Sequence, residues 1–167
     1  MILTFYMKNF LLIPFLLFFA QTTISQELLV YHTFDDFEKA IIKNDENVYV
    51  VNFWATWCAP CVKELPYFEK LHQENKKVKV ILVSLDSKND IETKLIPFIK
   101  RKKITAQVVA LTDKDYNIWL NAIDSNWSGS IPATLIFLGN QKLFAEREFE
   151  NFIELNEYSN SFINQLK

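Results

Sequence analysis

Two cysteines, Cys58 and Cys61, stand three positions apart in the segment NFWATWCAPCVKELP, residues 52–66. A thiolate attacks a disulfide through a mixed disulfide, so a C-x-x-C pair can carry out thiol–disulfide exchange. The pair follows an apolar, β-branched segment and opens one with helical periodicity. The free N–H groups and dipole at a helix N-terminus stabilise an anion, which favours Cys58 as the nucleophile. Pro60 stiffens the first turn without removing a needed hydrogen bond.

The same cysteine pair has other chemical interpretations. It could be half of a zinc site, but no second cysteine pair exists, and His32 and His72 are far apart in the sequence. It could be an inert structural disulfide, although closing so short a loop constrains the unfolded chain little. Copper binding by two thiolates is a further alternative. The pattern favours redox chemistry, and we expect no metal site.

The composition excludes several other classes of function. The chain has 167 residues, of which 50% are hydrophobic and 23% charged, so it can bury a core, and its length favours one domain. A formal net charge of -2 leaves no basic excess for binding nucleic acid. The two glycines, Gly129 and Gly139, cannot make a glycine-rich phosphate loop.

The N-terminal residues have the pattern of an export signal. Lys8 precedes the uncharged run FLLIPFLLFFA, residues 10–20, and the segment TTISQ follows with small residues. This apolar run is shorter than the ~20 residues that span a bilayer. We predict a signal peptide over residues 1–25, cleaved after Ser25, with Ala20 as the second choice.

An uncleaved membrane anchor is the alternative interpretation of this segment, and Met7 could be the true start of the chain. Either way, residues 26–167 would face an exported compartment, the periplasm or cell envelope, where cysteine pairs can be oxidised.

The mature chain alternates between helical and extended patterns. We predict helices over 33–43, 59–75, 91–102, 116–123 and 151–166, and strands over 47–55, 78–85, 107–111, 133–138 and 142–149. Pro66 and Pro97 are expected to kink two of the helices. The alternation predicts an α/β fold with parallel strands and helices on both faces, and the terminal hairpin makes the sheet mixed.

The segment VNFWATWCAPC, followed by KELP and later by Gly-Ser-Ile-Pro-Ala-Thr, resembles the thioredoxin superfamily. Within it, the exported TlpA/ResA-like thiol-disulfide oxidoreductases fit best, and the resemblance covers about residues 47–149. The separation of 71 positions between Cys61 and Pro132 leaves room for an extra βα unit within residues 90–124. The resemblance therefore implies a thioredoxin fold with an insertion between the C-x-x-C helix and the cis-proline loop.

The resemblance also implies a role for each matching residue. Cys58 would be the attacking cysteine, and Cys61 the resolving one. Pro132 matches the family's cis-proline facing the pair, and the backbone of Ile131 would pair with an extended segment of the partner. Trp57 would flank this substrate groove. The alternative for Pro132 is an ordinary turn proline, and the alternative for Trp57 is a side chain that only packs in the core. For Trp54, core packing beneath the active-site helix is what we expect.

One departure from cytosolic thioredoxins concerns proton transfer. They carry a buried aspartate where this chain has Asn52, and an amide cannot accept a proton near neutral pH. Glu64 could assist deprotonation of Cys61, because ResA-like proteins place a glutamate at this point in C-x-x-C-x-x-E. The two residues share a helix face, and an apolar site would raise the carboxyl pKa. The alternative is a solvated surface glutamate. Ala55 stands where peroxiredoxins need a threonine, which disfavours peroxide reduction.

The resemblance implies an exported oxidoreductase that keeps the thiols of target proteins reduced, with no cofactor beyond its redox-active disulfide. Targets could include the haem-attachment cysteines of apocytochromes c, with electrons from a membrane thiol carrier, and we expect a monomer. A disulfide-forming or isomerising enzyme is the alternative, because the Ala-Pro pair between the cysteines does not fix the reduction potential. The alternative of another class is a non-catalytic binding or metal-chaperone module on the same fold.

Overall fold

The computed structural model describes residues 27–43 and 45–166, so the predicted signal peptide lies outside the described residues. The elements follow in the order β1 (Leu29–Tyr31), α1 (Phe34–Ile41), β2 (Val48–Trp54), α2 (Ala59–Glu74), β3 (Val78–Ser84), α3 (Ile96–Lys102), β4 (Gln107–Leu111), α4 (Tyr116–Ile123), β5 (Ala133–Leu138), β6 (Gln141–Ala145) and α5 (Phe152–Gln165). The predicted alternation of helices and strands is confirmed.

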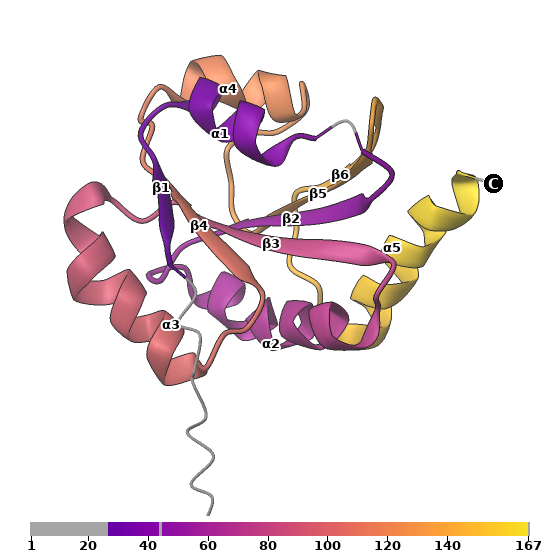
Figure 1. The fold of residues 1–167 in the computed structure, drawn as a ribbon, viewed down its shortest axis with the longest axis horizontal. Coiled ribbons are helices and arrows are strands. Elements are labelled where there is room, and N and C mark those ends of the chain that lie inside the picture. The colour runs from indigo at the N-terminus through magenta and orange to yellow at the C-terminus, as the bar shows by residue number, and fades with distance from the viewer. Residues whose placement is uncertain (1–26, 44, 167) are drawn as a thin grey trace, which may run out of the picture.

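The strands form one mixed sheet in the order β1-β4-β3-β2-β5-β6 (Figure 1). Strands β1, β4, β3 and β2 run parallel, whereas β5 is antiparallel to β2 and β6 is antiparallel to β5. Asn52 of β2 therefore lies opposite Leu82 of β3 on one side and Thr134 of β5 on the other. This arrangement places β2, which leads to Cys58, in the interior of the sheet.

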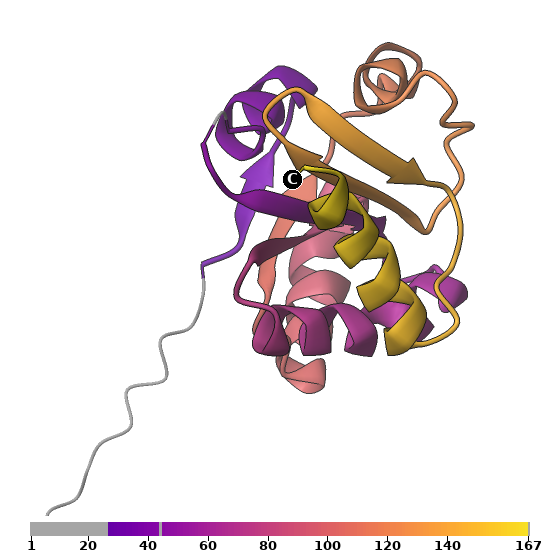
Figure 2. The same ribbon diagram turned by 90° about the vertical axis from the view of Figure 1, so that its right-hand side faces the viewer.

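Helices cover both faces of the sheet: α1 and α4 lie on one face, and α2, α3 and α5 on the other (Figures 1 and 2). Side chains of β2 alternate between the two cores. Val50 and Trp54 pack on the side of α2, while Val51 and Phe53 pack on the side of α1 and α4. Because both faces are covered, every residue of β2 is buried, which explains its unbroken apolar sequence.

The insertion predicted between the C-x-x-C helix and the cis-proline loop is confirmed. Between α2 and that loop the chain forms β3, α3, β4 and α4, and β4 takes a place in the sheet between β1 and β3. Among the described residues, no helix has both the length and the apolarity to cross a bilayer.

The predicted helix over 91–102 is divided in two. Residues Ile91–Leu95 form a π-helical turn, preceded by a 3₁₀ turn over Lys88–Asp90, and α3 begins only at Ile96. The N–H of Ile96 donates to the carbonyl of Ile91, five residues back. Pro97 then stands in the first turn of α3, where its missing N–H costs no hydrogen bond.

Two strand predictions need correction. The edge strand β1 was not predicted, because a three-residue strand with half-exposed side chains is too short to show a period. The strand predicted over 142–149 ends at Ala145. Beyond it the chain leaves the sheet, and Phe149 is buried in the core on the side of α2. Residues 146–150, which join β6 to α5, are called the connector below.

Candidate active site

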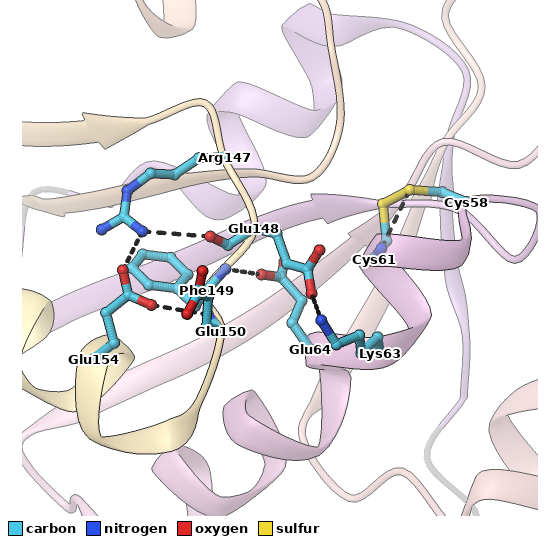
Figure 3. Close-up of polar contacts among 9 residues, drawn as sticks. All are labelled: Cys58, Cys61, Lys63, Glu64, Arg147, Glu148, Phe149, Glu150 and Glu154. Atoms are coloured by element: carbon cyan, nitrogen blue, oxygen red, sulfur yellow. Dashed lines mark hydrogen bonds and ion pairs between the residues drawn. A yellow bond between two sulfur atoms is a disulfide. The ribbon is translucent and has the colours of Figure 1, made fainter.

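The cysteine pair lies where β2 ends and α2 begins. Cys58 is the N-cap of α2, and its Sγ accepts a hydrogen bond from the main-chain N–H of Cys61 at 3.3 Å. The two residues form a disulfide, with their Cα atoms 5.3 Å apart (Figure 3). Cys58 is 6% exposed, whereas Cys61 is fully buried. Since exchange needs access to the attacked sulfur, the geometry favours Cys58 as the sulfur that meets a partner.

The loop before β5 lies beside Cys58. The Ile131–Pro132 peptide bond is cis, as the resemblance implies, and the carbonyl oxygen of Ile131 is 3.7 Å from Cys58 Sγ. Pairing of β5 with β2 brings these segments together, because Ala133 lies opposite Phe53. The main chain of Ile131 therefore lies beside the sulfur of Cys58, and its pairing with a partner segment stays a prediction.

Trp57 and Pro60 are neighbours of the two cysteines in the chain, and both are exposed. Trp57 is 65% exposed, so it is not a core tryptophan, while Pro60 is an exposed residue in the first turn of α2. Trp54, by contrast, is fully buried in one cluster with Cys58 and Cys61, as predicted. An exposed aromatic ring next to Cys58 in the chain is available to contact a partner polypeptide.

Glu64 is fully buried, so the alternative of a solvated surface glutamate is wrong. Its Oε1 accepts a hydrogen bond from Nδ2 of Asn52 at 2.8 Å. Its Oε2 accepts one from the main-chain N–H of Phe149 at 2.8 Å, which Figure 3 shows. Asn52 Nδ2 also lies 3.2 Å from Oγ1 of Thr134. Glu64 is one helical turn beyond Cys61, inside the protein.

The pKa of Glu64 is raised from 4.5 to about 7, chiefly because the side chain is buried. The hydrogen bonds from Phe149 and Asn52 act in the opposite direction, and the charge of Glu148 acts in the same direction as burial. A carboxyl group that titrates near neutral pH can accept or donate a proton under physiological conditions. Glu64 is thus a buried group that titrates near neutral pH one helical turn from Cys61, and its role as the proton acceptor for that cysteine stays a prediction.

A Glu64→Gln variant is expected to reduce the pH dependence of folding stability. The pKa of Glu64 is about 7 in the folded protein against 4.5 as its ordinary value, so folding favours the protonated form. Its contribution to stability is fully present below pH 4.5 and is lost as the pH rises to about 7. The loss reaches about 3 kcal/mol at most, and the glutamine side chain of the variant would not titrate.

Urea unfolding of the oxidised protein across this pH range measures the effect as a slope. A glutamine side chain can accept only one of the two hydrogen bonds that Asn52 and Phe149 donate. Losing the other lowers the unfolding free energy by the same amount at every pH, so the slope of unfolding free energy against pH still reports the titration of Glu64. Glu74→Gln, at a 57% exposed side chain on the same helix, is the control and should keep the wild-type slope. An unchanged slope in Glu64→Gln would contradict the assignment.

Asp86 was not singled out by sequence, yet it holds the loop that carries the cysteines. It is 1% exposed, and its carboxylate accepts hydrogen bonds from the N–H of Thr56 at 3.0 Å and from Oγ1 of Thr56 at 2.5 Å. The hydroxyl of Ser84 donates to it at 2.7 Å. Thr56 precedes Cys58 by two residues. The available signal was its position just after a buried parallel strand, where functional groups gather.

The connector crosses beside α2 on its way to α5 (Figure 3). Lys63 Nζ and Glu148 Oε1 are 2.5 Å apart, and Arg147 forms an ion pair with Glu154 of α5. Among the residues that the structure describes, no three His, Cys, Asp or Glu side chains are grouped so that they could hold a metal ion.

The sheet with its two helical layers, and the disulfide at the start of α2 facing a cis-proline, define a thioredoxin-like domain. The AhpC/TSA family matches residues 31–145, and the chain belongs to that family. The resemblance to the thioredoxin superfamily is thereby confirmed.

Individual relatives agree with this assignment. The thiol-disulfide oxidoreductase ResA of Halalkalibacterium halodurans is 30% identical over 112 residues, which are 63% of this chain and 60% of that protein. The chain thus spans less than two thirds of this curated relative. A thioredoxin-related protein from Neisseria meningitidis serogroup B has a similar structure, with a TM-score of 0.61 and 24% identity over 74% of this chain and 90% of the other.

A secreted disulfide oxidoreductase of Mycobacterium tuberculosis, homologous to E. coli DsbE, also has a similar structure. Its TM-score is 0.54 at 17% identity, and the match covers 71% of this chain and 84% of the other. At these identities the two structures establish the likeness of the fold.

Proposed function

We propose that this protein is an exported thiol–disulfide oxidoreductase that exchanges its Cys58–Cys61 disulfide with the thiols or disulfides of partner proteins. The observation that carries the proposal is the sulfur of Cys58, which lies at a helix N-terminus, 3.7 Å from the carbonyl oxygen of Ile131, in the more exposed of the two cysteines. A relative named as a thiol-disulfide oxidoreductase supports it. Ala55, in place of a threonine, disfavours peroxide reduction as the activity.

In the reducing direction, the Cys58 thiolate attacks one sulfur of a partner disulfide. The partner S–S bond breaks, a mixed disulfide with Cys58 forms, and the other partner sulfur leaves as a thiolate. Cys61 then gives its proton to Glu64 and attacks Cys58 Sγ, which releases the second partner thiol and closes the internal disulfide. Two electrons pass from the cysteine pair to the partner. The N–H of Cys61 stabilises charge on Cys58 Sγ during attack.

The reducing direction is the one that we propose for the cell. The active-site segment resembles ResA-like proteins, and on that basis the partners are apocytochromes c, with a membrane thiol carrier as the electron source. Export is supported by the predicted signal peptide and by the secreted protein of similar fold from Mycobacterium tuberculosis. A monomer suffices, because one chain supplies both cysteines, Glu64 and the cis-proline loop.

The reduction potential of the cysteine pair tests this direction. Equilibration in glutathione or dithiothreitol buffers, read by mass after thiol alkylation, gives its value. A potential near thioredoxin's, about -270 mV, is expected for a reductant. A value near about -120 mV would make the protein an oxidant and overturn the proposed direction. Failure of the pair to oxidise reversibly would overturn the enzymatic function and favour metal binding by the two thiolates.

A further inference from the structure

The carboxylate of Glu146, the first residue after β6, binds the main chain of a distant loop. Its Oε2 accepts a hydrogen bond from the N–H of Ser128 at 3.0 Å, and its Oε1 accepts one from the N–H of Ser130 at 2.8 Å. The hydroxyl of Ser128 also donates to Oε1. One side chain thus satisfies two main-chain donors and a hydroxyl of the segment that enters the cis-proline loop.

The loop is fixed from its other side as well. Nε1 of Trp127 donates to the carbonyl of Ser130 at 2.9 Å, so both the N–H and the carbonyl of Ser130 are held. Gly129 has φ +93°, and a Cβ atom there would lie 3.2 Å from Cδ1 of Leu120. Ser130 immediately precedes Ile131, whose carbonyl faces Cys58. The position of Ser130 therefore determines where the Ile131 main chain lies relative to the disulfide.

Glu146 belongs to a segment that is itself anchored. Three residues further on, Phe149 is fully buried, with ring centroids 6.2 Å from Phe68 of α2 and 5.3 Å from Tyr158 of α5. The N–H of Phe149 donates to Glu64. These contacts fix the connector against α2, the helix that begins at the cysteines. Glu146 therefore holds the cis-proline loop at a fixed position relative to Cys58.

We propose that Glu146 is a positioning residue that fixes the main chain of Ser130 and Ile131 beside Cys58, so that a partner polypeptide can align there for attack on its disulfide. The inference rests on the proposed function and specifies how the same site binds polypeptides. Partial burial raises the pKa of Glu146, but the hydrogen bonds from Ser128 and Ser130 outweigh it and leave the pKa below its ordinary value. An ionised carboxylate makes stronger hydrogen bonds to N–H donors than a neutral one does.

The test compares a polypeptide substrate with a small one. In Glu146→Ala, we expect the rate of insulin reduction to fall by about tenfold or more, because a displacement of about 1 Å can cost ~10²-fold in rate. The equilibrium constant of the cysteine pair with glutathione and the rate of reduction by dithiothreitol should each stay within about twofold of wild type, because Cys58 and Cys61 lie on other elements. In a variant that is only destabilised, insulin reduction and reduction by dithiothreitol would change together.

Glu150→Ala is the matched control, because it removes the same charge from the same connector. Among the described residues, the side chain of Glu150 has no hydrogen bond, and all rates should stay at wild-type values. Ser128→Ala removes one hydroxyl donor but keeps both main-chain bonds, so its loss should be smaller than that of Glu146→Ala. Wild-type insulin reduction in Glu146→Ala, or an equal loss with dithiothreitol, would overturn the proposal.

Amide hydrogen exchange decides the question even if the wild-type protein does not reduce insulin. Loss of the carboxylate should speed exchange of the Ser128 and Ser130 amides by about tenfold or more, and Glu150→Ala should not. Unchanged exchange in Glu146→Ala would overturn the positioning role. A wild-type cysteine pair that fails to oxidise reversibly, together with the expected exchange pattern, would instead overturn the proposed function and leave the positioning of the loop established.

Discussion

Replacing Cys58 by serine is expected to abolish thiol–disulfide exchange, reducing insulin turnover to the uncatalysed rate. Cys58 is the more exposed of the two cysteines, at 6%, while Cys61 is fully buried and cannot take over the attack on a partner. The variant should stay folded, since a disulfide between residues three positions apart constrains the unfolded chain little. Insulin reduction in the presence of dithiothreitol measures the loss, and circular dichroism checks the fold.

The matched variant Cys61→Ser keeps the nucleophile and removes the resolving thiol. It should attack a partner disulfide and then accumulate the mixed disulfide, because no second sulfur is present to release the partner. Non-reducing electrophoresis and mass spectrometry detect that adduct. An adduct on Cys61 in the Cys58→Ser variant would reverse the assigned roles. Wild-type cellular function in both variants would favour the non-catalytic binding module.

Trp54→Ala is expected to cost about 3–5 kcal/mol of unfolding free energy, the range seen for deleting a buried large aromatic side chain. Trp54 is fully buried in the cluster that holds both cysteines, and its ring centroid is 5.3 Å from that of Phe98 of α3. Its removal leaves a cavity between the sheet, α2 and α3. Urea unfolding followed by circular dichroism gives the change in free energy.

Two variants show whether the loss comes from packing. Among the described residues, Nε1 of Trp54 has no hydrogen-bond partner, so Trp54→Phe gives up ring volume without leaving an orphaned acceptor. It should cost about half as much as the alanine variant or less. Trp57→Ala, at a side chain 65% exposed, should change stability by no more than about 0.5 kcal/mol. A loss below about 1 kcal/mol in Trp54→Ala would contradict the packing argument.

Local signals were sufficient for the cysteine pair and for most elements. The apolar run of β2 and the periodicity of α2 each arise within a few consecutive residues, and these two elements alone place Cys58 at a helix N-terminus. The prediction for residues 107–111 matches β4, and that for 116–123 matches α4. The edge strand β1 was not predicted, because three residues are too few to show a period. The predicted end of β6 was wrong, because Phe149 is apolar not as a strand residue but because it packs in the core on the side of α2.

The role of Glu64 depends partly on local sequence and partly on tertiary structure. The spacing of Glu64 from Cys61 and the resemblance to ResA-like proteins predict it as the proton acceptor from local sequence alone. Its pKa of about 7 depends on burial and on hydrogen bonds from Asn52, twelve residues away, and Phe149, eighty-five residues away. Helical spacing fixed the face of α2 on which Glu64 lies, but the connector that covers this face comes from the other end of the domain.

The sequence by itself determined the redox chemistry, the class of fold and the order of the elements around the cysteines, because each depends on neighbouring residues or on short motifs. Only the tertiary structure decided which carboxylates position the two loops at the disulfide. Asp86 contacts Thr56 across thirty residues, and Glu146 contacts Ser128 across eighteen. An acidic side chain has the same local pattern on a solvated surface and against main-chain N–H groups, and only the folding of distant segments onto one another distinguishes the two.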